Sequence, residues 1–95
     1  MPYIDKSDRK LFDFVDIFRN MLDDYEISEG DLNYIITRLC HTWLSSKKLR
    51  YNRINTAIGV LECAKLELYR QVAVPYEDVK KAENGSVSDL DGGAD

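Results

Sequence analysis

The segment from residue 52 to residue 74, NRINTAIGVLECAKLELYRQVAV, constrains the fold of this chain more than any other part of the sequence. It contains no proline and one glycine, and its apolar residues recur at the three- and four-residue steps of a helix. One apolar stripe comprises Ile54, Ala57, Ile58, Leu61, Ala64, Leu68 and Val72, and a second comprises Gly59, Val60, Cys63, Leu66, Tyr69 and Ala73. A helix that is apolar over so much of its circumference requires neighbours on more than one side.

Two helices are predicted before this central helix. The first begins after Asp5 or Ser7, each a good N-cap residue, and runs to about Asp24. The second spans roughly residues 31 to 46, and Ser28 and Asp31 ahead of it have the spacing of a capping pair. Both segments carry apolar residues at helical spacing, so the pattern predicts an all-α fold of three antiparallel helices.

Pro75 is expected to end the central helix, because proline lacks the amide donor and disfavours helix at the preceding residue. It suits equally the first turn of a short C-terminal helix that runs from Tyr76 to about Glu83 and stops at Asn84-Gly85. We therefore expect a helical domain over residues 1–85. Residues 86–95, SVSDLDGGAD, are predicted to form a disordered acidic tail.

Composition excludes several classes of function. The net charge of −4 argues against binding to duplex nucleic acid, which requires a surplus of Lys and Arg. No segment approaches the roughly 20 apolar residues of a membrane span, and the charged start does not resemble a signal peptide. We expect a cytoplasmic location, which is the host cytoplasm if the chain is phage-encoded.

Nothing in the sequence indicates catalysis or a cofactor. Cys40 and Cys63 form no CxxC motif and no cluster with His41, the one histidine, so no zinc site is predicted. Both cysteines fall in apolar helical patterns, which favours buried reduced thiols. No glycine-rich phosphate loop or dinucleotide fingerprint is present. We expect a protein that is not an enzyme.

The length of the central helix predicts self-association. At 1.5 Å per residue it reaches about 33 Å, whereas the two helices before it reach about 24 Å each. One end of the central helix therefore overhangs, and its apolar residues there need cover from the last helix or from a second subunit. We expect a homodimer or a higher oligomer.

A basic stretch precedes the central helix and is the first candidate ligand site. Lys47, Lys48, Arg50 and Arg53 are four cations within seven residues of an acidic chain. Free amide groups and the positive end of the helix dipole also meet there, and together they favour an anion. Tyr51 offers a ring for stacking on a base. The alternative interpretation is a solvated loop, and the sequence leaves both open.

Three segments carry a family resemblance: GDLNYIITRL at residues 30–39, GVLECAKLELYRQV at residues 59–72 and PYEDVKKAENG at residues 75–85. With the MPYI start, they resemble a small uncharacterised helical family of tailed-phage genomes and some bacteria, over residues 1–87. The family has no established activity. The resemblance implies that its polar positions are candidate site residues: Asn33, Tyr34, Arg38, Glu62, Glu67, Tyr69, Arg70, Tyr76, Glu77 and Asn84.

Two hypotheses of function follow from this resemblance and from the charges. The first is a non-enzymatic oligomer that sequesters a phosphate-bearing, nucleotide-derived signal of host defence. Its cations would bind phosphate, its tyrosines would stack on the base, and Glu62 or Asn33 would bind ribose hydroxyls. The alternative is an inhibitor or adapter, similar in role to anti-CRISPR proteins, that binds and blocks a host protein through the central helix and the acidic surface of the first helix.

Overall fold

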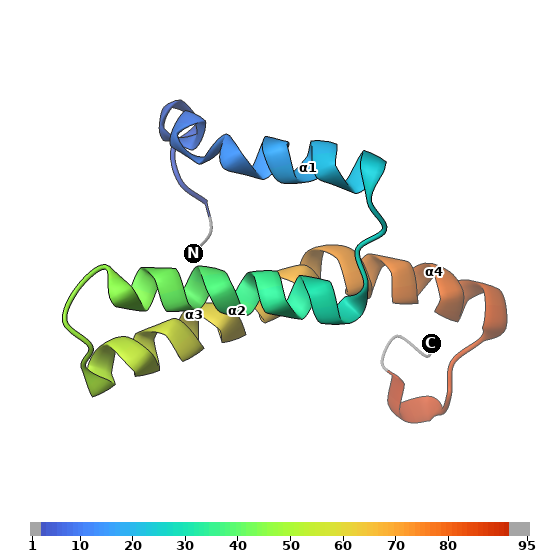
Figure 1. The fold of residues 1–95 in the computed structure, drawn as a ribbon. Helices are drawn as coiled ribbons and strands as arrows, with labels where there is room; N and C mark the ends of the chain where they lie inside the picture. Colours follow the sequence, from blue (N-terminus) through green and yellow to red (C-terminus); the bar gives the residue numbers. More distant parts are fainter. Residues whose placement is uncertain (1–2, 92–95) are drawn as a thin grey trace. The chain divides into compact units, whose positions relative to one another are not determined.

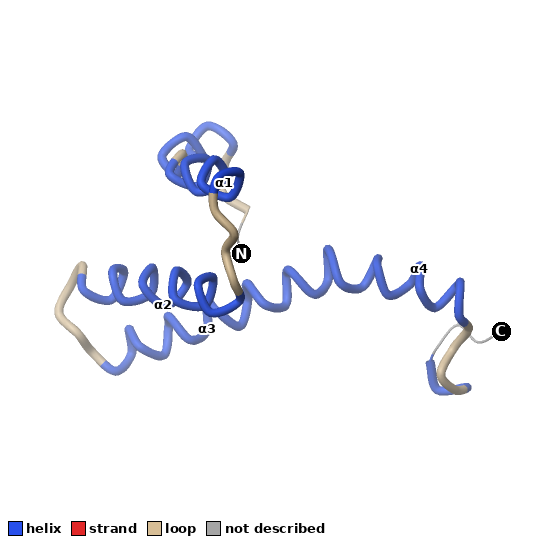
Figure 2. Tube along the Cα trace, turned by 45° about the vertical axis from the view of Figure 1, so that its right-hand side comes forward, coloured by secondary structure: helices blue, strands red, loops and turns tan. Residues whose placement is uncertain are grey.

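The computed structural model describes residues 3–91, and this part of the chain is helical without a strand (Figures 1 and 2). An all-α fold is thus confirmed. A 3₁₀ segment (Lys6–Phe12) precedes α1 (Phe14–Asp24) and α2 (Glu29–Ser45). Then follow α3 (Tyr51–Leu68), a π-helical segment (Tyr69–Ala73), α4 (Val74–Asn84) and a short 3₁₀ turn (Asp89–Asp91). The chain divides into two compact units, Met1–Ile58 and Gly59–Asp95, with the boundary inside α3.

The first helix begins later than the sequence predicts. The side chain of Asp5 makes no capping hydrogen bond, and the Asp8 amide donates to the Asp5 carbonyl at 2.9 Å, three residues back. Asp13, immediately before α1, also makes no side-chain cap bond. Without a capped first turn, the tighter 3₁₀ pattern common at helix termini extends over Lys6–Phe12. The end of α1 at Asp24 agrees with the prediction.

The start of α2 is fixed by the capping box that the sequence predicts. The Asp31 amide donates to Ser28 Oγ at 3.1 Å, and the Ser28 amide donates to Asp31 Oδ2 at 3.0 Å. Two amides that have no intrahelical partner are thereby satisfied. Because Ser28 is the N-cap, α2 starts at Glu29, two residues earlier than expected.

Pro75 does not interrupt the helical path, so the expectation that it ends the central helix is wrong, whereas its alternative placement in the first turn of a C-terminal helix is confirmed. The helical path continues from α3 through the π-helical segment into α4, where Pro75 lies in the first turn. The Val74 amide donates to the Tyr69 carbonyl, five residues back, instead of the usual four. In a regular α-helix the proline ring would clash with the carbonyl four residues earlier, and the wider turn relieves that clash. The chain leaves α4 at Gly85, as predicted, with a φ of 85° and its amide 2.7 Å from the Lys81 carbonyl.

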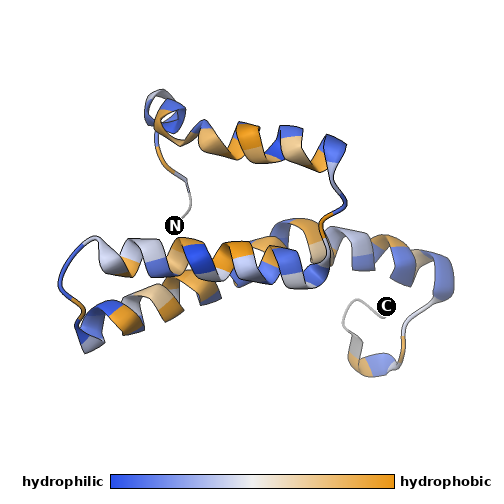
Figure 3. Cartoon of the chain, viewed as in Figure 1, coloured by the Kyte–Doolittle hydropathy of each residue, from blue (hydrophilic) through white to orange (hydrophobic). Residues whose placement is uncertain are grey.

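The apolar stripes of the helices are largely uncovered. Ala57, which is 8% exposed, is the one buried residue in the part of the chain that the structure describes. Figure 3 shows hydrophobic and hydrophilic residues alternating along the helices. Phe18, Ile35, Leu44 and Ile54 are half-buried, but most large apolar side chains of α1, α2 and α3 are exposed. Each of these three helices therefore keeps apolar residues at its surface.

The capping box allows a direct test of the start of α2. Ser28→Ala removes the bond that Ser28 Oγ accepts from the Asp31 amide and leaves the backbone bond from Ser28 in place, and we expect it to lower the free energy of unfolding by about 1 kcal/mol. The backbone hydrogen bond from Ser28, followed by the bond with its side chain, holds the pKa of Asp31 below its ordinary value of 3.8. The contribution of Asp31 is therefore present above pH 4 and is lost as the pH falls through the lowered pKa.

Urea unfolding followed by circular dichroism measures both effects. Ser7→Ala is the matched control, because Ser7 lies in the 3₁₀ segment and caps no α-helix. Equal stability of the two variants would contradict the capping role.

Candidate functional site

The turn between α2 and α3 is organised by Arg53. Its Nη2 donates to the Trp43 carbonyl at 2.8 Å and to Ser46 Oγ at 3.4 Å. Its guanidinium carbon also lies 4.2 Å from the centre of the Trp43 ring. A cation that satisfies a carbonyl at the C-terminus of α2 also suits the negative end of the helix dipole. Arg53 therefore fastens the first turn of α3 to the last turn of α2.

The other basic residues of this turn face solvent. Lys47, Lys48 and Arg50 are exposed, and within residues 3–91 they make no ion pair. Tyr51, the first residue of α3, is 76% exposed. The structure thus brings four predicted ligand-binding residues together at the start of α3, while the fifth, Arg53, is turned toward α2.

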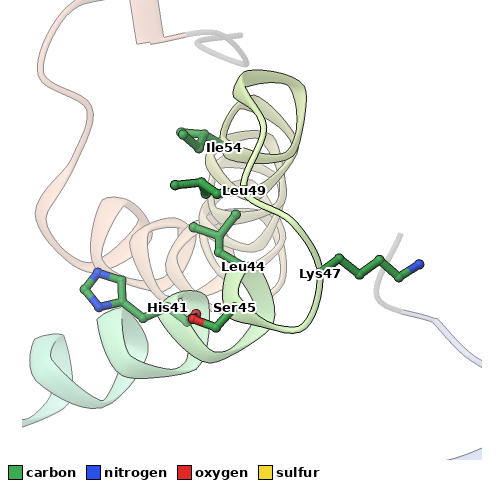
Figure 4. A pocket seen from close by; sticks show the side chains of 6 residues that line it. All are labelled: His41, Leu44, Ser45, Lys47, Leu49 and Ile54. Carbon is green, nitrogen blue, oxygen red and sulfur yellow. The ribbon is translucent and has the colours of Figure 1, made fainter.

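A shallow hollow of about 450 Å³ lies beside this turn, lined by His41, Leu44, Ser45, Lys47, Leu49 and Ile54. Figure 4 shows Leu44, Leu49 and Ile54 gathered on one side of the turn, while Lys47 extends away from them. The floor of the hollow is therefore aliphatic and its margin is basic. The sequence pattern did not reveal this hollow, because Leu49 lies in the loop outside both helical stripes.

The predicted site residues of α2 are paired with one another along the helix surface. Arg38 Nη1 donates to the Tyr34 hydroxyl at 2.9 Å, and the guanidinium lies 5.8 Å from the ring centre. Thr37 Oγ1 donates to Asn33 Oδ1 at 3.2 Å. All four side chains are exposed, so these contacts order a polar face of α2 without forming an enclosed site.

Most predicted site residues of the second unit form short-range surface pairs. Glu62 accepts from Lys65 at 3.4 Å, Arg70 lies 3.6 Å from Glu67, and Lys80 lies 5.6 Å from the ring centre of Tyr76. Pairs between residues three or four apart on an exposed helix contribute little to stability. These paired side chains therefore form a solvent-exposed face of the helix.

Tyr69, at the start of the π-helical segment, differs from these pairs. Its neighbour is Glu77, eight residues further on, whose negative charge raises the pKa of the Tyr69 hydroxyl above the ordinary value of 10.0. The hydroxyl also donates a hydrogen bond to the Glu77 carboxylate, which acts in the same direction. This contact joins the π-helical segment to α4.

Among residues 3–91 there is no group of His, Cys, Asp and Glu side chains that could hold a metal ion. Both cysteines are free, but only Cys40 is half-buried, whereas Cys63 is exposed, contrary to the expectation of two buried thiols. Over the same residues, no helix combines the length and the apolar character that crossing a membrane requires.

These features define a small all-α protein with uncovered apolar helix faces and a basic interhelical turn. The chain belongs to the family described as Domain of unknown function (DUF6899), whose model matches residues 1–87. The match covers the same residues over which the sequence resembles an uncharacterised helical family. No curated protein matches the chain, and no solved structure does.

The contact between Tyr69 and Glu77 predicts an abnormal tyrosine titration. We expect one tyrosine to ionise above pH 10.0 and Glu77→Gln to return it toward the ordinary value, because both the charge and the acceptor are weakened. Nuclear magnetic resonance of ring-labelled tyrosine resolves it from the other five. Because the folded pKa is raised, the stabilisation is present below pH 10 and is lost as the pH rises through the folded value.

Glu83→Gln is the control, since Glu83 pairs with Lys80 and not with Tyr69. A Tyr69 signal that shifts equally in both variants would show that its pKa reports the net charge of α4 and not the Glu77 contact.

Proposed function

We propose that this protein is a non-enzymatic adapter or inhibitor that binds another protein through the apolar stripe of α3. The observation that carries this proposal is the exposure of that stripe: Ile58 is 59% exposed, Leu61 41% and Leu68 63%. Contiguous apolar surface of this kind marks protein interaction sites in soluble proteins. An amphipathic helix presents such anchors at three-, four- and seven-residue steps to a partner groove.

The resemblance of the three segments implies that the protein acts in a phage or bacterial setting. A chain of this kind would blunt a host defence by covering a host protein. The acidic residues of the first helix and the 3₁₀ segment before it support a basic partner surface, since Asp5, Asp8, Asp13, Asp16, Asp23 and Asp24 all lie there.

Site-specific photo-cross-linking in the producing cell tests this proposal. A photoreactive phenylalanine at Leu68 should give a discrete adduct with one other protein, because Leu68 lies in the exposed stripe. Asn55, an exposed polar position on another side of α3, is the control and should give none. Mass spectrometry identifies the cross-linked protein in each adduct. The absence of an adduct at Leu68, or the same adducts at both positions, would contradict the proposal.

A second candidate function is sequestration of a phosphate-bearing, nucleotide-like ligand, favoured by the exposed Lys47, Lys48 and Arg50 at the start of α3. Charge-assisted bonds from these cations suit phosphate oxygens, and Tyr51 is free to stack on a base. In this proposal a cleft between subunits of an oligomer would enclose the ligand.

A thermal-shift panel of linear and cyclic nucleotides tests the second candidate. We expect a ligand at one hundred times its Kd to add about 2.7 kcal/mol to the free energy of unfolding, because it binds the native state only. The triple variant Lys47→Gln, Lys48→Gln and Arg50→Gln should remove that effect. An unchanged melting temperature across the panel would reject sequestration of these nucleotides and leave the protein-binding proposal intact.

A further inference from the structure

The unit Met1–Ile58 has two uncovered apolar surfaces. The first is the apolar face of α1, formed by Phe14, Val15, Ile17, Phe18, Met21 and Leu22. Ile17 is 71% exposed and Phe14 is 54% exposed, and Phe18 is only half-buried. The second surface is the aliphatic hollow beside the α2–α3 turn, with Leu44, Leu49 and Ile54 on its floor (Figure 4).

The two surfaces also carry opposite charges. Helix α1 contains Asp16, Asp23 and Asp24 against one cation, Arg19. The segment from residue 46 to 53 contains four cations and no acidic residue. On the surface of α1, Asp13 and Asp24 lie four residues before and seven residues after Ile17, on the same side of the helix. A partner that seats Ile17 in the hollow therefore brings two carboxylates to the basic margin.

We infer that two copies of this chain pair through these surfaces, with the apolar face of α1 of each copy seated on the α2–α3 hollow of the other. Since both surfaces belong to one chain, a single two-fold axis forms both contacts at once. A second copy is also present wherever the chain is made. The inference rests on the proposed function only in treating exposed apolar area as an interface, and its apolar surface is the face of α1 instead of the stripe of α3.

Sedimentation equilibrium of the full chain tests the apolar contact. The wild-type protein should be a dimer at micromolar concentration. Ile17→Gln should weaken it about 100-fold, because the side chain is buried twice per dimer and glutamine keeps the helix propensity. Since Ile17 is 71% exposed within one chain, the loss of a chain's own packing does not explain such an effect.

Charge reversal tests the orientation. The variants Asp13→Lys/Asp24→Lys and Lys47→Glu/Lys48→Glu should each weaken the dimer about tenfold. An equimolar mixture of the two should pair better than either alone, because both contacts of the mixed dimer then join opposite charges. A chain carrying all four substitutions should recover the wild-type Kd. Asp16→Lys/Asp23→Lys is the matched control, since it changes the net charge equally on the far side of α1 and should leave the Kd unchanged.

The outcomes separate this inference from the proposed function. A wild-type monomer at millimolar concentration, or a dimer that Ile17→Gln and both reversals leave unchanged, would overturn the pairing. A monomer that still gives the Leu68 adduct overturns only the pairing. A dimer with the expected variant effects but no Leu68 adduct overturns only the proposed function.

Discussion

The contact of Arg53 with Trp43 joins α2 to α3 and positions the residues of the turn between them. One guanidinium satisfies a carbonyl at the end of α2, stacks on an indole ring and starts α3. Cation–π attraction of this kind contributes about 0.5–2 kcal/mol, and the charge-assisted hydrogen bond adds to it. With this contact formed, Leu44, Leu49 and Ile54 share one hollow, and the remaining cations of the turn are left facing solvent.

The elements that the sequence predicts correctly are those decided by chemistry within a few residues. Ser28 and Asp31 cap α2 because their side chains reach each other's amides within one turn. Gly85 ends α4 because its positive φ favours glycine. Pro75 was misjudged because the rule assumes a hydrogen bond four residues back, and the helix changes that spacing to five.

The features that the sequence could not predict are those that depend on which residues contact a side chain in the folded chain. The pattern identifies Leu61 and Phe14 as apolar and as members of a stripe, but it does not say that neither is covered within the chain. Arg53 was assigned to an anion site by its charge and neighbours, and its contact with Trp43 arises from a turn that brings residues ten apart together. The pairing of Tyr69 with Glu77 spans more than two helical turns, beyond the range of neighbour rules.

The π-helical segment Tyr69–Ala73 has a consequence for length variation in this family. A turn closed five residues back accommodates one residue more than an ordinary turn does. Because the wider turn absorbs the extra residue, removing one residue there would restore regular winding with little change in the direction of the later side chains. The helix would remain continuous, and α4 would present nearly the same face. The segment is therefore a position at which chains of this kind can differ by one residue in length and keep the surface of α4.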